Sequence, residues 1–344
     1  MSRMPGPTRT RDPAGDRRRL LGILADAQFH SGEQMAACLG VSRSAVWKHL
    51  AWLRARGIDI DAAPRRGYRL SRHADLLDRS LILASLSAEA RARVSALEVL
   101  LEVDSTNRYA AQMPAPDPGC AAACLAEIQS AGRGRRGRSW LAPFGSGLCM
   151  SIVWTFADLP ASFPALGLAV GIGVVRGLSL LGASGLALKW PNDIVARGRK
   201  LGGILIEVRG EATQGTAVVI GVGLNLELPA KSRLDLATHH AVEATDLREV
   251  MGDALPDRNR VAGALLAAVP EVLSTFEVSG FGPFQNEWRQ LDAVHGNPVR
   301  LIAGDRVIRG VAQGVAGDGA LLLDTGIAIE RYVSGELSLR VDRT

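Results

Sequence analysis

The chain has 344 residues, of which 47% are hydrophobic and 5% are aromatic, and its formal net charge is +5. This length predicts two or three domains, and the composition is ample for a hydrophobic core. The charge is uneven, because residues 1–80 hold fifteen Lys or Arg against eight Asp or Glu, whereas residues 81–344 hold twenty-five against twenty-seven. We therefore expect a polyanionic partner at the N-terminal fifth and not elsewhere.

The N-terminus and the cysteines indicate the compartment. Residues 1–17 are rich in Pro, Arg and Gly and lack the apolar stretch of a secretory signal, so we expect a disordered basic tail. The four cysteines form no C-x-x-C pair and have no histidine at ligand spacing, which favours buried free thiols in a reducing compartment over zinc ligands or disulfides. They are Cys38, Cys120, Cys124 and Cys149.

Residues 18–72 show the pattern of a winged helix-turn-helix domain. We expect a first helix over 18–28, a second that begins with a capping box at Ser31 and Gln34, and a third from Ser42 to about 56. Two short strands follow, at 58–63 and 68–70. Such a domain places its second motif helix in the major groove and its wing on phosphates or in the minor groove. A domain used only for packing or protein contact is the alternative, but the local positive charge favours DNA. The candidate DNA-binding residues are Ser42, Arg43, Ser44, Trp47, Lys48, Arg65 and Arg66.

Residues 73–290 alternate between apolar strands and helices. One segment, 163–188, carries Arg176 as its only charge, but its six glycines dilute the hydrophobicity, so we expect a buried helix at about 164–181 and not a membrane span. Val261 to Phe276 is the clearest further helix, and a shorter helical stretch is expected at 76–86. The expected strands are 96–103, 121–129, 148–155, 186–190, 203–208 and 216–228.

Polar residues recur where these buried strands end. Ser105, Thr106 and Asn107 follow the first strand, where a plain helix N-cap is the alternative interpretation. Convergence of polar groups at one edge of a sheet is how ligand sites are built. The other polar residues at strand ends are Lys189, Asn192, Asp193, Lys200 and Asn225.

The stretch from Gly132 to Trp140, GRGRRGRSW, alternates glycines with four arginines. Glycine lets backbone N–H groups approach a ligand, and guanidinium groups bind phosphate or carboxylate oxygens in pairs. We expect an anion-binding loop that is mobile when empty and ordered when filled. The alternative is a solvated face or a nucleic-acid patch. Dinucleotide and P-loop motifs overlap this stretch, but both need a following helix, and the proline and two glycines within 139–147 exclude one.

The C-terminal residues 291–344 change to short strands separated by Gly-Asp turns. Strands are expected at 299–302, 307–315, 320–324 and 328–333. About five strands in fewer than fifty residues predict a small SH3-like barrel. The fold class is therefore α+β, with a winged helix-turn-helix at 18–72, a mixed-sheet α/β domain at 73–290 and this barrel at 291–344.

Four motifs in order give this chain a family resemblance. GRGRRGRSW, then KWPND (189–193), then KLGGIL (200–205) and GVGLN (221–225) resemble the biotin–protein ligases, whose catalytic domain is class II synthetase-like. With a winged helix in front, the chain resembles the bifunctional ligases that also repress biotin synthesis genes. The resemblance covers about residues 18–342.

The resemblance implies an activity and its partners. ATP and biotin, with Mg²⁺, would give biotinyl-5′-AMP and pyrophosphate, and the biotinyl group would pass to one lysine of the biotin carboxyl-carrier domain of acetyl-CoA carboxylase. The adenylate would act as corepressor by favouring a homodimer on operator DNA. The protein is expected in the cytoplasm, without a membrane. Alternatives are a pure transcription factor that senses biotin, and a ligase of the related lipoate type.

The resemblance also implies roles for individual residues. Lys200, Arg133 and Arg135 would be catalytic, and Asp193 is a possible metal ligand. The residues expected to bind biotin are Ser105, Thr106, Asn107, Gln129, Arg133, Gly134, Arg135 and Lys200. Those expected to bind the nucleotide are Arg135, Arg136, Arg138, Trp140, Lys189, Asn192 and Asn225.

Overall fold

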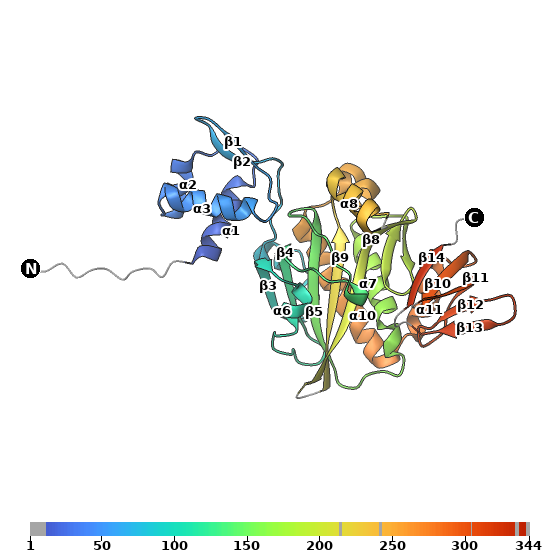
Figure 1. The fold of residues 1–344 in the computed structure, drawn as a ribbon. Helices are drawn as coiled ribbons and strands as arrows, with labels where there is room; N and C mark the ends of the chain where they lie inside the picture. Colours follow the sequence, from blue (N-terminus) through green and yellow to red (C-terminus); the bar gives the residue numbers. More distant parts are fainter. Residues whose placement is uncertain (1–11, 213–214, 241–242, 304, 334–336, 342–344) are drawn as a thin grey trace, which may run out of the picture. The chain divides into compact units, whose positions relative to one another are not determined.

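A computed structural model describes residues 12–212, 215–240, 243–303, 305–333 and 337–341 (Figure 1). The chain divides into two compact units, residues 1–76 and 77–344. Of the tail expected at 1–17, residues 1–11 lie outside the described residues, whereas helix α1 (Pro13–Leu24) already begins within it. The reason is local, because Asp12 accepts hydrogen bonds from the amides of Ala14 and Gly15, and proline suits the first helical position.

The N-terminal unit is a winged helix-turn-helix, as predicted. Helices α1, α2 (Gly32–Leu39) and α3 (Arg43–Arg54) precede the antiparallel pair β1 (Ile60–Ala63) and β2 (Gly67–Leu70). The capping box at Ser31 and Gln34 is present, and Gly40 ends α2 in the left-handed conformation. The expected spacing in α3 is confirmed, since its core side chains are buried. They are Val46, Leu50 and Leu53.

A seven-stranded mixed sheet forms the centre of the second unit. Its strand order is β3-β4-β5-β9-β8-β7-β6, with β3 parallel to β4 and all other neighbours antiparallel. The strands are β3 (Val94–Val103), β4 (Ala121–Gln129), β5 (Gly147–Phe156), β6 (Leu186–Lys189), β7 (Asp193–Ala196), β8 (Arg199–Ala212) and β9 (Gly215–Asn225).

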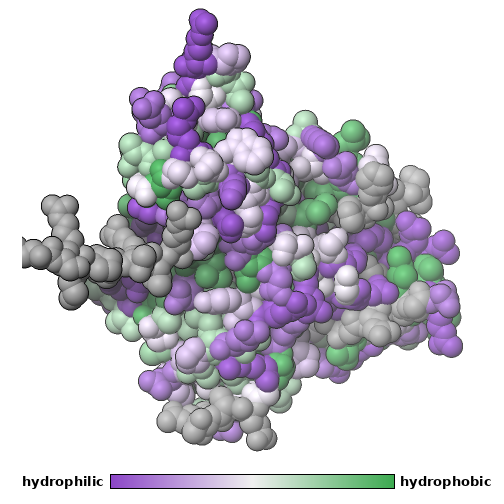
Figure 2. Space-filling view, turned by 60° about the vertical axis from the view of Figure 1, so that its left-hand side comes forward, coloured by the Kyte–Doolittle hydropathy of each residue, from purple (hydrophilic) through white to green (hydrophobic). Residues whose placement is uncertain are grey.

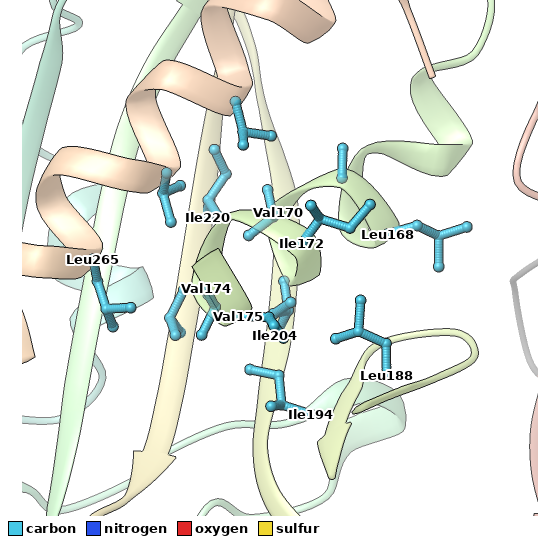
Figure 3. Close-up of a cluster of buried hydrophobic side chains, with 14 of the residues drawn as sticks. Leu168, Val170, Ile172, Val174, Val175, Leu188, Ile194, Ile204, Ile220 and Leu265 are labelled. Carbon is cyan, nitrogen blue, oxygen red and sulfur yellow. The ribbon is translucent and has the colours of Figure 1, made fainter. Parts of the chain in front are cut away.

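Two long helices, α7 (Leu166–Leu180) and α10 (Arg258–Ser279), pack against one face of this sheet (Figure 1). Figure 3 shows leucine, valine and isoleucine side chains of α7 lying among Ile204 and Ile220 of the sheet and Leu265 of α10. Gly173 and Gly177 of α7 permit this contact, because a Cβ at either would come within 3.0–3.1 Å of α10 atoms.

These two helices are also long and apolar enough to cross a membrane. Both are core elements instead, since 67% of the apolar stretch that includes α7 and 61% of that in α10 are buried. On the face shown in Figure 2, hydrophobic residues are scattered among hydrophilic ones. The expected buried helix is confirmed.

The C-terminal strands form an antiparallel five-stranded sheet in the order β13-β12-β11-β10-β14, in agreement with the prediction of about five strands. A hydrogen bond of 3.0 Å from Trp190 Nε1, just after β6, to the backbone oxygen of Gly319 joins the turn between β11 and β12 to the central sheet. The strands are β10 (Pro298–Ala303), β11 (Arg306–Val315), β12 (Leu321–Asp324), β13 (Ile329–Tyr332) and β14 (Leu337–Val341).

The strand expected at 203–208 begins four residues earlier, at Arg199. Arg197 and Gly198 make a tight turn at positive φ (50° and 72°), and β8 begins directly after it. Lys200 therefore lies on a strand, where its position is fixed by pairing with β7.

The shorter helices are α4 (Arg79–Ala84), α5 (Ala88–Ala92), α6 (Thr106–Ala110), α8 (Ala230–His240), α9 (Leu247–Met251) and α11 (Gln285–Leu291).

Candidate active site

A cavity lies over the central sheet, and most of the predicted site residues line it. Strand alternation explains its floor, since Gly221 and Gly223 of β9 line the cavity while Ile220 and Leu224 enter the core. Arg136, Lys189 and Asp193 are not among the described residues that line it. The predicted residues that do are Ser105, Thr106, Asn107, Gln129, Arg133, Gly134, Arg135, Arg138, Trp140, Asn192, Lys200 and Asn225.

Hydroxyl and amide groups at the start of α6 make one wall of the cavity. The amide nitrogen of Thr106 donates to Gln129 Oε1 at 2.7 Å, which joins α6 to the end of β4. Ser151 of β5 lies 2.8 Å from the Thr106 hydroxyl and 2.7 Å from Asn107 Oδ1. The Ser105 side chain makes no capping hydrogen bond with the helix. This wall is suited to hydrogen bonding a compact polar head group.

The two glycines of β9 make room for the side chains above them. A Cβ at Gly221 would lie 2.2 Å from Asn107 Oδ1, and one at Gly223 would lie 2.6 Å from Trp140 Cε2. Trp140 is therefore seated directly on the backbone of β9, and Lys200 Nζ lies 5.8 Å from the centre of its ring. A flat indole beside an ammonium can accept a stacked aromatic base.

Two lysines, one at the end of β6 and one near the start of β8, gather around Asp193, the first residue of β7. Lys200 Nζ lies 2.5 Å from Asp193 Oδ1, and Lys189 Nζ lies 3.6 Å from Asp193 Oδ2. Burial favours the neutral acid, but the charges of Lys200 and Lys189 outweigh it and lower the pKa of Asp193. Burial lowers the pKa of Lys189, against the opposing effect of Asp193. The Asp193 carboxylate thus forms ion pairs with two ammonium groups, and that of Lys200 lies at the cavity.

The arginine loop is a small hydrogen-bonded hairpin. The amide of Gly134 donates to the backbone oxygen of Arg138 at 2.7 Å, and that of Trp140 to Gly132 at 2.9 Å. Arg135 Nη1 donates to Asn192 Oδ1 at 3.3 Å, and burial lowers its pKa from the usual 12.5. The loop thereby spans from β4 to the turn before β7. Its mobility in the empty protein stays a prediction.

Asn225 and segment 243–245 support the cationic end. Asn225 Nδ2 donates to the backbone oxygen of Thr245 at 3.0 Å, and the amide of Lys200 donates to that of Glu243 at 2.8 Å. The Asn225 side chain is 4% exposed, so its contacts here are mainly with the protein. It positions β8 and β9 beside the cavity.

Some cavity residues were missed by sequence reasoning. Cys149 and Leu236 line the cavity, and Ser151 lies behind its wall, where it hydrogen-bonds the Thr106 hydroxyl. Each lies inside a strand or a helix and not at its end, so only the fold reveals its place. Burial raises the pKa of Cys149 to about 12, as it does for Cys124, so both are unreactive thiols. The expectation of buried thiols is wrong for Cys38, which is exposed at the C-terminal end of α2.

The N-terminal unit presents a separate basic surface. Ser42, Arg43, Ser44 and Lys48 are exposed on α3, and Trp47 is 61% exposed, which is high for a tryptophan. A groove lined by Arg43, Ser44 and Trp47 of α3 and by Arg65 of the wing runs between the helix and the wing. Arg66 is exposed as well, with its guanidinium 4.1 Å from the ring of Phe29.

The described part of the chain contains no group of three or more His, Cys, Asp or Glu able to hold a metal ion. Asp193 is a single carboxylate whose two oxygens face ammonium groups. Mg²⁺ that accompanies a triphosphate is held by one or two carboxylates together with phosphate oxygens. The residues present therefore fit an ion that arrives on the nucleotide.

Three family models match the chain in order. An HTH domain covers residues 16–69, the biotin/lipoate A/B protein ligase family covers 100–225, and the biotin protein ligase C-terminal domain covers 294–340. These matches fall on the winged helix, the cavity-bearing sheet and the C-terminal strands.

Relatives match over nearly the whole length. The chain is 38% identical to the bifunctional ligase/repressor BirA of Escherichia coli, over 94% of this chain and 96% of that protein. The Bacillus subtilis protein of the same name is 31% identical over 94% of this chain and 98% of its own length. Among solved structures, the biotin protein ligase from Aquifex aeolicus in complex with biotin and ATP is 30% identical, with a TM-score of 0.60, and covers 72% of this chain and 100% of that one.

Proposed function

The chain belongs to the family of the bifunctional ligase/repressor BirA, and from that membership and the cavity we infer that it is an ATP-dependent biotin–protein ligase and a DNA-binding repressor. The observation that carries the ligase activity is a single cavity with a hydrogen-bonding wall at α6 and a cationic end at Lys200, under an arginine loop. Biotin and ATP are its substrates.

The first step brings two anions together. A biotin carboxylate oxygen attacks the α-phosphorus of ATP, the bond to the β-phosphate oxygen breaks, and biotinyl-5′-AMP and pyrophosphate form. Arg133, Arg135 and Lys200 offset the repulsion and stabilise the charge on the phosphorus oxygens. The ion pair with Asp193 holds the ammonium group of Lys200 in place.

The two substrates take different parts of the cavity. Biotin's head group and chain bind to Ser105, Thr106, Gln129 and the Gly134 backbone. Asn107 acts through Ser151, which hydrogen-bonds both Asn107 Oδ1 and the Thr106 hydroxyl. Trp140 stacks on adenine, with Asn192 and Arg138 near the phosphates, and Asn225 holds the strand ends. Lys189 and Arg136 lie outside the cavity lining, so we propose that they meet the pyrophosphate at its mouth.

The second step transfers the biotinyl group to protein. The neutral amine of a carrier lysine attacks the carbonyl carbon, the bond to the AMP phosphate oxygen breaks, and the nitrogen loses a proton. The arginine loop excludes water from the mixed anhydride until the amine arrives. The acceptor is the biotin carboxyl-carrier domain of acetyl-CoA carboxylase. Asp193, which also pairs with Lys189 and Lys200, would be the protein ligand of Mg²⁺, and the bound ion would neutralise triphosphate charge.

The N-terminal unit reads operator DNA. Arg43, Ser44, Trp47 and Lys48 of α3, capped by Ser42, face the major groove, and Arg65 and Arg66 of the wing contact phosphates or the minor groove. The adenylate acts as corepressor by favouring a homodimer that spans two half-sites, and by linkage dimerisation tightens adenylate binding equally. Both activities belong to the cytoplasm.

One experiment tests the ligase. Purified protein is incubated with ATP, Mg²⁺, biotin and a carrier domain, and the intact mass of the carrier is measured. We expect one biotinyl addition, absent when the acceptor lysine is replaced by arginine. An unmodified carrier together with no biotin-dependent ATP–pyrophosphate exchange would refute the proposed activity.

A further inference from the structure

Two acceptor groups fix the orientation of the Asn107 side chain. Asn107 Nδ2 lies 2.7 Å from Glu207 Oε2 and 3.3 Å from the backbone oxygen of Leu205. A carboxylate and a carbonyl oxygen can only accept, so the NH₂ group must face them and the amide oxygen must face away. Asn107 is 4% exposed, so a reversed amide would bury unpaired acceptors against one another.

The amide oxygen in turn directs the hydroxyl proton of Ser151. Ser151 Oγ lies 2.7 Å from Asn107 Oδ1 and 2.8 Å from Thr106 Oγ1. The hydroxyl has one proton, and Asn107 Oδ1 can only accept it, so Ser151 donates to Asn107. The oxygen of Ser151, which is fully buried, then needs a donor from its other side.

Thr106 is that donor. Its hydroxyl is 2.8 Å from Ser151 and 3.2 Å from Gln129 Oε1, and the latter already accepts the Thr106 amide at 2.7 Å. With its one proton directed to Ser151, Thr106 Oγ1 keeps only lone pairs. Thr106 and Gln129 both line the cavity, so both present acceptor oxygens on the same wall.

Backbone packing leaves this arrangement little freedom. A Cβ at Gly221 would come within 2.2 Å of Asn107 Oδ1, so the amide lies directly on β9. Gly203, Leu205 and Glu207 occupy alternate positions of β8, which places Glu207 on the same side of the sheet as the cavity. Glu207 itself is not among the described residues of the cavity lining and is partly exposed.

We propose that Glu207 is a positioning residue that sets the direction of the chain Thr106 → Ser151 → Asn107 → Glu207, and thereby makes the cavity wall an acceptor for ligand N–H groups. The proposal rests on the proposed function, because the cyclic urea of biotin offers N–H donors there. Glu207 acts through the three side chains between it and the ligand. It does not touch biotin.

The variant Glu207→Gln tests this. A glutamine at this position can offer either its NH₂ group or its oxygen to Asn107, so the direction of the chain is imposed only by the longer hydrogen bond of 3.3 Å to the Leu205 oxygen. Isothermal titration of the full-length protein should show biotin binding weakened about tenfold, the effect of one misdirected hydrogen bond. In pyrophosphate exchange the KM for ATP should stay within about twofold of the wild-type value, since general destabilisation would raise the KM for both substrates.

A ligand analogue separates positioning from structural damage. In a cyclic carbamate analogue of biotin, one ureido N–H is replaced by oxygen, which two facing acceptor oxygens repel. The wild type should bind this analogue about 100-fold more weakly than biotin, and Glu207→Gln only about tenfold more weakly. Ser151→Ala interrupts the same chain and should lose the same discrimination. Glu277→Gln is the matched control, because Glu277 lies on α10, where it accepts a hydrogen bond from the amide of Ala157 away from the cavity.

The outcomes are distinct. Unchanged biotin affinity in Glu207→Gln, or equal weakening of biotin and the analogue in both variants, overturns the inference while leaving the ligase intact. A wild-type protein that binds no biotin and forms no adenylate overturns the proposed function and the inference with it. Thermal unfolding of each variant, compared with Glu277→Gln, identifies loss of binding that is due to misfolding.

Discussion

Replacement of Arg135 by glycine tests whether the arginine loop retains the adenylate. Arg135 holds the loop to the turn before β7 by its hydrogen bond to Asn192. A hydrogen bond to a charged group contributes about 1.5–3 kcal/mol, and since this bond is 3.3 Å long we take the lower end. Glycine adds backbone freedom worth about 0.5 kcal/mol, and the sum of about 2 kcal/mol corresponds to roughly 30-fold in the closed population.

The assay separates formation of the adenylate from its retention. Arg135→Gly should still form biotinyl-5′-AMP, but a chase with unlabelled biotin should show release about 30-fold faster than in the wild type. The released mixed anhydride should label lysines of a bystander protein. Arg197→Gly is the control, because Arg197 is exposed at a φ of 50°, where glycine removes the same charge without backbone strain. Release at the wild-type rate from Arg135→Gly would refute the retaining role of the loop.

Three further predictions follow from the geometry. Gly223→Ala should raise the KM for ATP about tenfold, because its Cβ would lie 2.6 Å from Trp140; an unchanged KM would contradict the seating of adenine on Trp140. The pKa of Asp193 is lowered from 3.8 in the fold, so its contribution to stability is present above pH 3.8 and is lost as pH falls through the folded value. In Asp193→Asn, Tm measured by calorimetry should therefore fall less steeply below that pH, and an equal slope would argue against the lysine pairing. Trp47→Ala should weaken operator binding by about ten- to 100-fold in fluorescence anisotropy without changing the salt dependence, whereas equal loss on operator and random DNA would exclude base reading by Trp47.

Local chemistry explains which elements could be predicted. The capping box at Ser31 and Gln34, the turn at Gly40 and the spacing of Val46 and Leu50 act within a few residues, so they could be recognised in the sequence and are confirmed. The start of α1 was missed because the Pro-rich tail also contained a cap at Asp12. The hairpin turn at Arg197 was not predicted, because a non-glycine residue at positive φ gives no reliable sequence signal.

The candidate site divides in the same way. The polar residues that end strands, such as Thr106, Gln129 and Lys200, were predictable because buried apolar runs end there and a charged or hydroxyl group has to leave the core. Ser151 and Glu207 gave no such signal, because each lies within a strand. Their role depends on which strands are neighbours, a long-range property.

The sequence by itself determined the classes of element, the family motifs and the cationic character of the loop at 132–140, because these depend on residue types at short spacing. Only the tertiary structure decided that Asn107, Ser151 and Glu207 share a chain of hydrogen bonds, and that Asp193 carries two lysines. It also left Arg136 and Lys189 outside the cavity lining. The physical reason is that hydrogen-bond direction and charge pairing depend on distances between strands, which the order of β5, β9 and β8 sets.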